Sequence, residues 1–242
     1  MKRLLDILGA TVGLLLASPV LLPVMFLVWK QDGFSPFYIA PRVAKGGDSF
    51  RMVKLRSMVK NADKSGVDST AADDKRITAV GHFIRRYKLD ELTQLWNVLL
   101  GDMSLVGPRP NVKRDCDLYT QEEKGLLDVR PGITDFSSIV FSDEGEILAG
   151  KADPDLSYNQ IIRPWKSRLG LFYIAHRGVY LDVQLIFLTA VAIISKPRAL
   201  AGVCRILQRL NAPEQLIAVA RRDQPLQAAP PPGASAIVTS RT

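Results

Sequence analysis

The hydrophobic pattern begins with a long apolar stretch from Leu4 to Trp29, interrupted by a few residues, namely Asp6, Thr11, Ser18, Pro19 and Pro23. At about 1.5 Å per residue in a helix, this stretch is long enough for a membrane segment. A signal peptide is the alternative, but the stretch is longer than the usual apolar core of one and no A-x-A-like cleavage site follows. We therefore predict that residues 1–30 form a membrane-anchoring helix.

The residues Ser18-Pro19 and the flanking charges bear on how this helix meets the bilayer. Pro19 removes a helical hydrogen bond and disfavours helical geometry at Ser18, whose hydroxyl could bond a freed carbonyl, so we expect a bend. Lys2 and Arg3 precede the segment, and basic residues also outnumber acidic ones between Lys30 and Lys60. Positive charge on both sides indicates that both ends stay on the cytoplasmic face, as in a re-entrant hairpin. A kinked spanning helix remains the alternative.

Residues 31–200 carry the patterns expected of one small domain. Gly46-Gly47 precedes the alternating run Phe50–Leu55, which predicts a short β-hairpin within residues 33–60. The polar stretch Lys60–Thr78 is expected to be a loop or a short solvated helix. Apolar residues then recur at helical spacing until Gly101, so that Asp90 and Glu91 are expected at the N-terminus of a helix; the recurring residues are Leu92, Leu95, Trp96 and Leu99.

The C-terminal part predicts further helices. A polar helix is expected over Val112–Leu127, and Leu181–Ile194 is apolar but too short to span a bilayer, so it is either a core helix or an interfacial one, with the core favoured. Residues 201–223 are expected to form one amphipathic helix, and the proline-containing tail 224–242 to be disordered. The predicted fold class is α+β and mostly helical, with a re-entrant membrane helix, a short β-hairpin and interfacial amphipathic helices.

Composition narrows the chemistry. The 242 residues carry a formal net charge of +8, which points to an anionic partner such as phosphate, nucleic acid or an acidic membrane leaflet. Nucleic acid is disfavoured because the basic residues are not interleaved with aromatics in a recognisable module. The two cysteines, Cys116 and Cys204, lie far apart, and with only two histidines neither a disulfide framework nor a zinc site is indicated. Carboxylate and arginine chemistry remains.

Asp90 and Glu91 are the candidate chemical groups. Two carboxylates at a helix start are most often capping groups that face the positive end of the helix dipole. Here Arg85, Arg86 and Lys88 precede the pair, and Arg109 follows on a proline-bracketed loop. A helix N-terminus, several cations and two carboxylates together could bind a phosphate with Mg²⁺ and leave one carboxylate oxygen as a nucleophile.

The block Leu89–Pro110 resembles the signature of the bacterial sugar transferases, the monotopic polyprenyl-phosphate phosphoglycosyl transferases that start exopolysaccharide, O-antigen or glycoprotein glycan synthesis. Four further stretches are similar to this family and occur in the same order, covering roughly residues 1–195: Ser18-Pro19, Phe50–Met58, Val129–Thr134 and Tyr180–Asp182.

This resemblance implies specific roles. Asp90 would be the nucleophile and Glu91 its essential partner, with Mg²⁺ at this pair; Lys54, Arg85 and Arg109 would bind the donor diphosphate. The donor would be a nucleotide-diphosphate sugar, most often a UDP-sugar, and the acceptor polyprenyl (undecaprenyl) phosphate, through an aspartyl-phosphosugar intermediate. The membrane helix would be re-entrant and broken at Ser18-Pro19, which places the site on the cytoplasmic face of the bacterial inner membrane. Downstream glycosyltransferases and a second copy of the chain are candidate partners.

Three further residues are weaker candidates for substrate binding. Arg56 could contact phosphate, or instead lipid headgroups or a neighbouring carboxylate. Arg130 could bind the donor or fix the turn at Pro131-Gly132. Asp182 could position an arginine or cap the apolar helix that follows it.

The chain also departs from the commoner family pattern. It carries an acidic stretch at Asp143–Glu146 and a later Pro164-Trp165-Lys166, in place of an Asn-Gly-Arg stretch. This puts in doubt which arginine contacts the nucleotide and which sugar is used. A membrane-bound scaffold or anionic-lipid-binding module, in which Asp90 and Glu91 only cap a helix, is the competing interpretation.

Overall fold

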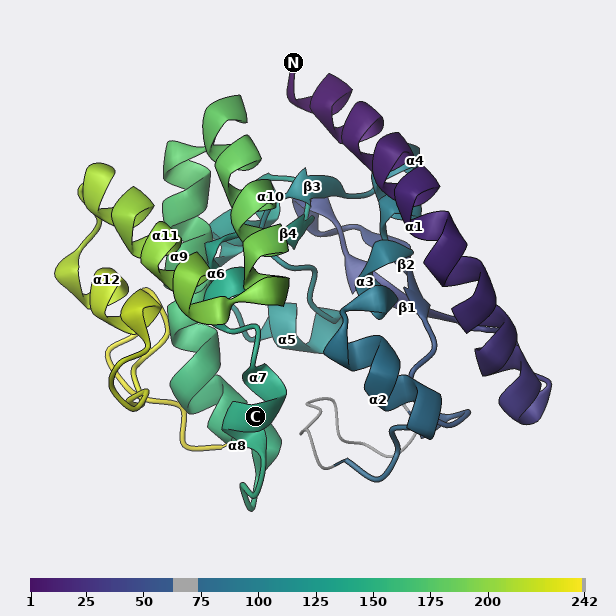
Figure 1. Ribbon diagram of the computed structural model, residues 1–242. Helices are drawn as coiled ribbons and strands as arrows, with labels where there is room; N and C mark the ends of the chain where they lie inside the picture. The colour runs from purple at the N-terminus through teal and green to yellow at the C-terminus, as the bar shows by residue number, and fades with distance from the viewer. Residues whose placement is uncertain (63–73, 241–242) are drawn as a thin grey trace.

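The computed structural model describes residues 1–62 and 74–240, so most of the expected loop Lys60–Thr78 lies outside the described residues. Helix α1 (Lys2–Asp32) runs along one side of the molecule, and α9 to α12 pack together on the opposite side (Figure 1). The β-hairpin and several short helices lie between them. The prediction of a mostly helical α+β protein with one short hairpin is confirmed.

Helix α1 stays helical through both of its prolines, Pro19 and Pro23. The hydroxyl of Ser18 donates a hydrogen bond to the carbonyl of Leu15 at 2.8 Å. That carbonyl is the one left without its usual backbone donor by Pro19, so the side chain replaces the missing bond. The structure therefore corrects the predicted helix break at Ser18-Pro19, and the reason is this local compensation.

Both ends of α1 are bound to the same domain. At the start, Lys2 pairs with Asp182 at 2.6 Å, and the buried carboxylate of Asp6 accepts hydrogen bonds from the Ser104 hydroxyl and the Leu105 N–H. At the far end, Asp32 pairs with Arg56. A helix of 31 residues is about 46 Å long, so two ion pairs at that separation position α1 along the length of the domain.

The hairpin consists of β1 (Phe37–Val43) and β2 (Ser49–Leu55), which pair antiparallel with Phe37 opposite Leu55. Its connection is the short helical turn η1 (Lys45–Gly47), where Gly46 and Gly47 have φ values of 82° and 93°. Only glycine enters this left-handed region without steric cost, which explains why the two glycines mark the turn.

The expected helix over residues 89–100 is divided into α3 (Leu89–Leu92) and α4 (Leu95–Leu100), after α2 (Ala79–Arg86). Gly101 ends α4 in a left-handed conformation with φ 97°, as predicted. The Asn97 side chain accepts from the N–H of Val53 and donates to the carbonyl of Arg51. These bonds attach α4 to β2 and so bring Lys54 of β2 beside the start of α3.

A second sheet, which the sequence analysis did not predict, joins two distant motifs. Strands β3 (Ser104–Val106) and β4 (Gly132–Thr134) pair in parallel. The Gly107 N–H donates to Thr134, and the Gly132 N–H donates to Pro108, each at 2.9 Å. A Cβ on Gly132 would lie 2.1 Å from the Gly107 nitrogen. The two backbone segments can therefore approach this closely only because both residues are glycine.

The remaining helices build the larger core. The single polar helix expected over 112–127 is instead two short elements. The single helix expected over 201–223 is instead two helices, and the chain turns between them at Asn211, which has a positive φ. The elements are α5 (Lys113–Asp117), η3 (Glu123–Asp128), α6 (Phe136–Val140), α7 (Glu144–Leu148), α8 (Pro154–Ser157), η4 (Tyr158–Ile162), α9 (Arg163–His176), α10 (Val179–Ile194), α11 (Lys196–Arg209) and α12 (Glu214–Arg221). Their core includes Phe136, Leu169, Tyr173, Leu185 and Val203.

The predicted disorder of the tail is not found for residues 224–240. The segment has no helix or strand, but it lies against η4 and α9. The N–H of Ala229 donates to the carbonyl of Gln160, the Gln160 side chain donates to Val238, and the indole of Trp165 donates to Gln227. Hydrogen bonds to residues of η4 and α9 therefore order a tail that its composition predicted to be disordered.

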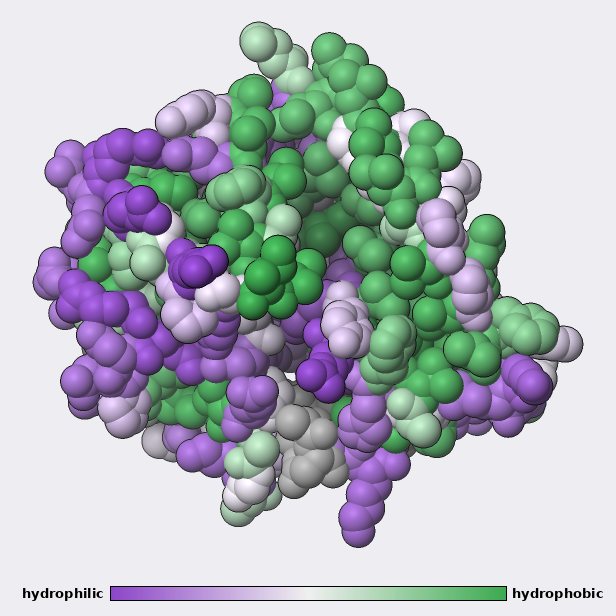
Figure 2. Space-filling view, viewed as in Figure 1, coloured by the Kyte–Doolittle hydropathy of each residue, from purple (hydrophilic) through white to green (hydrophobic). Residues whose placement is uncertain are grey.

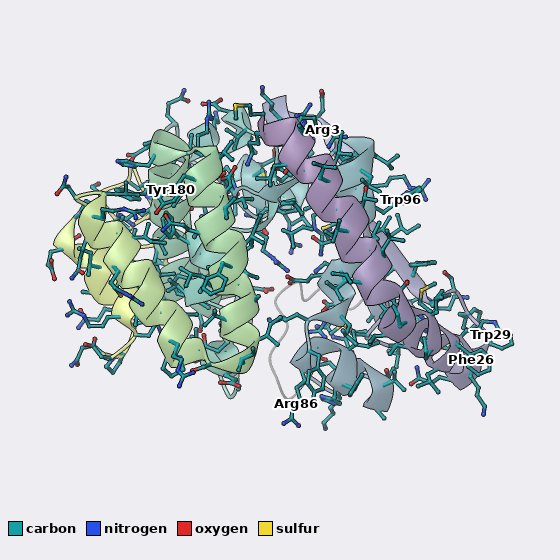
Figure 3. All side chains as sticks on the ribbon, turned by 45° about the horizontal axis from the view of Figure 1, so that its top comes forward. Arg3, Phe26, Trp29, Arg86, Trp96 and Tyr180 are labelled. Atoms are coloured by element: carbon teal, nitrogen blue, oxygen red, sulfur yellow. The ribbon has the colours of Figure 1, made fainter. Side chains whose placement is uncertain are left out.

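The outer faces of α1 and α10 leave apolar side chains exposed. Figure 2 shows this apolar surface over α1 and over the neighbouring edge of α10. Leu16 of α1, Trp96 of α4 and Phe187 of α10 are 75%, 53% and 67% exposed. In Figure 3, Arg3 lies at one end of α1 and Phe26 and Trp29 at the other. Helix α10 therefore has one face in the core, as the core interpretation predicted, and one face exposed.

We predict that Gly132→Ala disrupts the β3–β4 contact, because the added Cβ would overlap the Gly107 backbone. The expected loss is about 2–3 kcal/mol in the free energy of unfolding, measured by chemical denaturation. Gly178→Ala is the matched control, since a Cβ there meets nothing within 4 Å. Equal stability of the two variants would contradict this prediction.

Candidate active site

An open cleft of about 1510 Å³ lies between the α1 side of the molecule and the α10 side. Figure 2 shows the surface hollowed between these two parts. Most of the charged residues identified in the sequence line this cleft: Lys54, Arg85, Asp90, Glu91 and Arg109. Pockets for one small ligand usually occupy about 300–1,000 Å³, so this cleft has room for more than one ligand.

Asp90 is a half-buried residue whose carboxylate has one buried, unpaired oxygen. It occupies the first turn of α3, and Lys88, the residue directly before this helix, is in a left-handed conformation with φ 55°. Within the described part of the chain, Asp90 Oδ1 is buried and has no hydrogen-bond partner. Burial raises the pKa of Asp90, while the positive charge of Lys54 acts in the opposite direction. A buried unpaired oxygen that lines a cleft is expected of a group that gains its partner from a ligand.

Glu91, the adjacent carboxylate, is paired. Its Oε1 accepts a hydrogen bond from Arg109 Nη2 at 2.6 Å. Burial acts to raise the pKa of Glu91, but Arg109 and Lys54 lower it to about 2. In turn, the negative charge of Glu91 raises the pKa of Arg109 above its ordinary value. The two neighbouring carboxylates therefore have pKa values shifted in opposite directions, as is typical when adjacent groups have different chemical roles.

Cations surround the two carboxylates. Burial and the charge of Arg109 lower the pKa of Lys54 to about 8. Burial also lowers the pKa of Arg85, whose Nε donates to the Ser57 hydroxyl at 3.0 Å. Arg42, which the sequence analysis did not identify, lines the same cleft with a pKa lowered by burial. Half-buried cations with lowered pKa values would be stabilised by an anion, so the cleft is suited to bind phosphate groups.

The structure adds a second charged pair that the sequence analysis missed. Glu144, the first residue of α7, forms an ion pair with Lys166 of α9, and both line the cleft. Burial acts to raise the pKa of Glu144, but Lys166 lowers it below the ordinary value. The signal was present in the acidic stretch 143–146 and in the segment 164–166, which were noted only as a departure from the family pattern.

Two of the three weaker candidates for substrate binding have partners within the fold. Arg56 lines the cleft, and it donates to both carboxylate oxygens of Asp32 and to the carbonyl of Ser35, as the neighbouring-carboxylate alternative expected. Asp182 is buried and accepts from Lys2 and from the Tyr173 hydroxyl. Each of these two residues binds one end of α1.

The third, Arg130, is exposed and does not line the cleft, while its carbonyl lies beside Gly107. It therefore belongs to the turn before Gly132, as the alternative for this residue stated. Ser18 and Pro19 lie within α1 and are also outside the cleft.

The carboxylate pair is suited to a metal ion that takes few protein ligands. Among the described residues, no group of three or more His, Cys, Asp or Glu side chains is placed to hold a metal ion. Mg²⁺ is commonly bound by one or two carboxylates together with substrate phosphates and water. The unpaired oxygen of Asp90 and the neighbouring Glu91 match that donor set.

These features define an anion-binding cleft beside a long apolar helix, and comparison with known proteins gives the family. The model of the family described as "Bacterial sugar transferase" matches residues 1–196. The chain therefore belongs to the bacterial sugar transferase family, as the resemblance of its motifs predicted.

Curated relatives agree with this assignment. One, from Aeromonas hydrophila, is named UDP-N-acetylgalactosamine-undecaprenyl-phosphate N-acetylgalactosaminephosphotransferase and is 34% identical over 191 residues, which cover 78% of this chain and 42% of the relative. The undecaprenyl-phosphate galactose phosphotransferase of Salmonella typhimurium is 32% identical, covering 82% of this chain and 41% of the relative. The exopolysaccharide production protein ExoY of Rhizobium meliloti is 39% identical, covering 55% and 66%. The chain thus spans about two fifths of the length of the first two.

We predict that Asp90→Asn stabilises the protein. The substitution removes a buried charge whose oxygen has no partner, so the free energy of unfolding should rise by about 1 kcal/mol and the melting temperature by about 2–4 °C. Because burial raises the pKa of Asp90, the gain should be largest near neutral pH and should shrink as acid protonates the wild-type carboxyl.

Asp182→Asn is the matched comparison, since it leaves Lys2 without its carboxylate and should lower the melting temperature. A destabilised Asp90→Asn protein would contradict the view that this carboxylate is unfavourable to the fold.

Proposed function

We propose that this protein transfers a sugar-1-phosphate from a nucleotide-diphosphate sugar to polyprenyl phosphate, with Asp90 as the covalent nucleophile. The observation that carries the proposal is the buried, unpaired Asp90 oxygen among the cations of the cleft. A scaffold protein gives no reason to keep such a carboxylate, whereas a nucleophile requires a free oxygen lone pair.

The division of roles between the two carboxylates follows from their partners. Glu91 accepts a hydrogen bond from Arg109 at 2.6 Å, so it is suited to orient that guanidinium rather than to attack phosphorus. Asp90 has an unengaged oxygen, and its raised pKa makes that oxygen more basic. These contacts support Asp90 as nucleophile on physical grounds that do not depend on family resemblance.

The proposed reaction has two displacements. An Asp90 carboxylate oxygen attacks the β-phosphorus of the donor; the new bond joins Asp90 to phosphorus, and the bond to the oxygen that bridges the two phosphorus atoms breaks, releasing nucleoside monophosphate. A phosphate oxygen of the carrier then attacks the same phosphorus and releases the Asp90 carboxylate, giving polyprenyl-diphosphate-sugar. Lys54, Arg85 and Arg109 bind the diphosphate and reduce the repulsion between anions. Bound Mg²⁺ would neutralise further phosphate charge at the carboxylate pair.

The names of the relatives support both substrates: the name of the Aeromonas hydrophila protein includes UDP-N-acetylgalactosamine and undecaprenyl phosphate, and the name of the Salmonella typhimurium protein includes undecaprenyl phosphate. We extend both to this chain as part of the proposal. The first lipid-linked sugar of an exopolysaccharide or related glycan would be the product.

We further propose that the protein is monotopic and lies on the cytoplasmic face of the bacterial inner membrane. Helix α1 is the one helix among the described residues that is long and apolar enough to cross a membrane. However, Lys2 and Asp32 bind Asp182 and Arg56 of the same domain, so a spanning α1 would require breaking one of these ion pairs. An α1 that inserts its exposed apolar face into one leaflet keeps both pairs and places the cleft near the headgroups.

We predict that the purified protein, with Mg²⁺ and undecaprenyl phosphate, releases UMP from at least one UDP-sugar of a broad panel. Asp90→Asn should reduce this release by at least about 10³-fold, since the attacking oxygen is lost. Asp102→Asn is the control, because it makes the same change just beyond α4 at a residue that does not line the cleft.

Intact-mass measurement adds a second readout. With donor but no carrier, the wild type should gain the mass of one sugar phosphate and the Asp90→Asn protein should not. Absence of UMP release from the wild type with every donor would refute the proposed reaction.

For the membrane arrangement, we predict that cysteines inserted after Met1 and substituted at Lys30 are both labelled only from the cytoplasmic side. The experiment uses intact cells and a membrane-impermeant maleimide, in a background in which Cys116 and Cys204 are replaced. Labelling of either position from the periplasm would show that α1 spans the bilayer.

A further inference from the structure

The last two helices and the tail lie outside the region that matches the family, which ends at residue 196. Even so, two cations at the boundaries of these helices meet at one residue beside the cleft. Arg222, directly after α12, contacts both carboxylate oxygens of Asp143 at 3.1 Å. Lys196, the first residue of α11, forms an ion pair with the same carboxylate. A bidentate arginine with a second cation defines the orientation of Asp143 closely.

Both cations occupy positions that are locally unfavourable. Arg222 has φ 54°, in the left-handed region that residues other than glycine and asparagine rarely adopt. Lys196 lies in the first turn of α11, where the helix dipole disfavours positive charge. Local structure therefore does not explain why an arginine and a lysine occupy these positions. Their contacts with Asp143 explain it.

The contact extends over a whole segment. Arg222 also donates to the carbonyl of Val140 at 3.0 Å, and its guanidinium lies 5.7 Å from the centre of the Phe141 ring. In the same segment, the Ser142 carbonyl accepts a hydrogen bond from Lys88, the residue directly before α3. Residues 140–143 thus connect the C-terminal helices to the helix that carries Asp90.

Glu144 directly follows this segment and begins α7. Its carboxylate pairs with Lys166 and lies close enough to Arg109 that each shifts the pKa of the other. A carboxylate beside a diphosphate-binding arginine would repel phosphate, but it accepts hydrogen bonds well from hydroxyl groups. The donor carries hydroxyl groups on both its sugar and its ribose.

We propose that Glu144, with Lys166, binds hydroxyl groups of the nucleotide sugar, and that Arg222 and Lys196 are positioning residues that place Glu144 through Asp143. This inference rests on the proposed function, because it assigns a donor contact within the same cleft. The segment beyond residue 196 thereby contributes to donor recognition.

The experiment compares Arg222→Asn with Arg221→Gln. Asparagine tolerates the left-handed conformation, so Arg222→Asn removes the guanidinium with little backbone cost. Arg221 is its exposed neighbour, and its acidic contacts are long, at 3.8 and 4.0 Å, which makes it a matched control. Melting curves first establish that both variants are folded.

Steady-state UMP release then gives the kinetic parameters. We expect Arg222→Asn to raise the KM for the donor about tenfold, with kcat and the KM for the carrier within about twofold of wild type, as for loss of a hydrogen bond to a charged group. Glu144→Gln should have the same effect. The double variant should be no worse than Glu144→Gln alone, because both changes act through one carboxylate. Lys196→Gln should raise the donor KM in the same direction.

Competitive inhibition by UDP separates the two sources of hydroxyl groups. A raised inhibition constant for UDP in Arg222→Asn assigns the contact to the ribose, and an unchanged one assigns it to the sugar; each supports the inference. Arg222→Asn kinetics equal to those of Arg221→Gln, or an additive double variant, would overturn it while the proposed function stands. A wild type that releases no UMP overturns the proposed function and this inference with it.

Discussion

The close backbone approach of Gly107 and Gly132 is the constraint on which the site depends. It joins β3 to β4 and places the loop 107–110 against the turn before Gly132. Arg109 extends from this loop to Glu91 and pairs with it at 2.6 Å. Because Glu91 is engaged, Asp90 remains the carboxylate of the pair with an unpaired buried oxygen. A backbone contact without side chains thus positions the arginine that engages Glu91, while Asp90 Oδ1 stays unpaired.

The second organising feature is the attachment of α1. Its two ends bind the same domain through the buried carboxylate of Asp182 and the exposed carboxylate of Asp32, and its outer face remains apolar. The helix is therefore part of the domain, and the cleft and the apolar surface lie on one body.

The C-terminal helices extend this arrangement on the opposite side of the cleft. They bury apolar residues against α9 and α10, and they present Arg222 and Lys196 to Asp143. The cleft is thus bounded by residues from two distant parts of the sequence. Arg109 comes from the centre of the family signature, whereas the Asp143 contacts come from the end of the matched region and beyond it.

The sequence by itself determined the features that depend on short spacings. The α1 helix, the hairpin turn at Gly46-Gly47, the end of α4 at Gly101 and the start of α3 near Asp90 follow from local periodicity and glycine conformation. The family also followed from contiguous motifs. These features need no knowledge of distant contacts.

The tertiary structure alone decided the partners of the charged residues. Arg56 and Asp182 bind the two ends of α1, and Glu144 and Lys166, 22 positions apart, meet in the cleft. The β3–β4 pairing and the order of the tail are likewise contacts between distant residues. A charge carries no local signal of which opposite charge it will meet, because that choice is made by burial and by the packing of the whole chain.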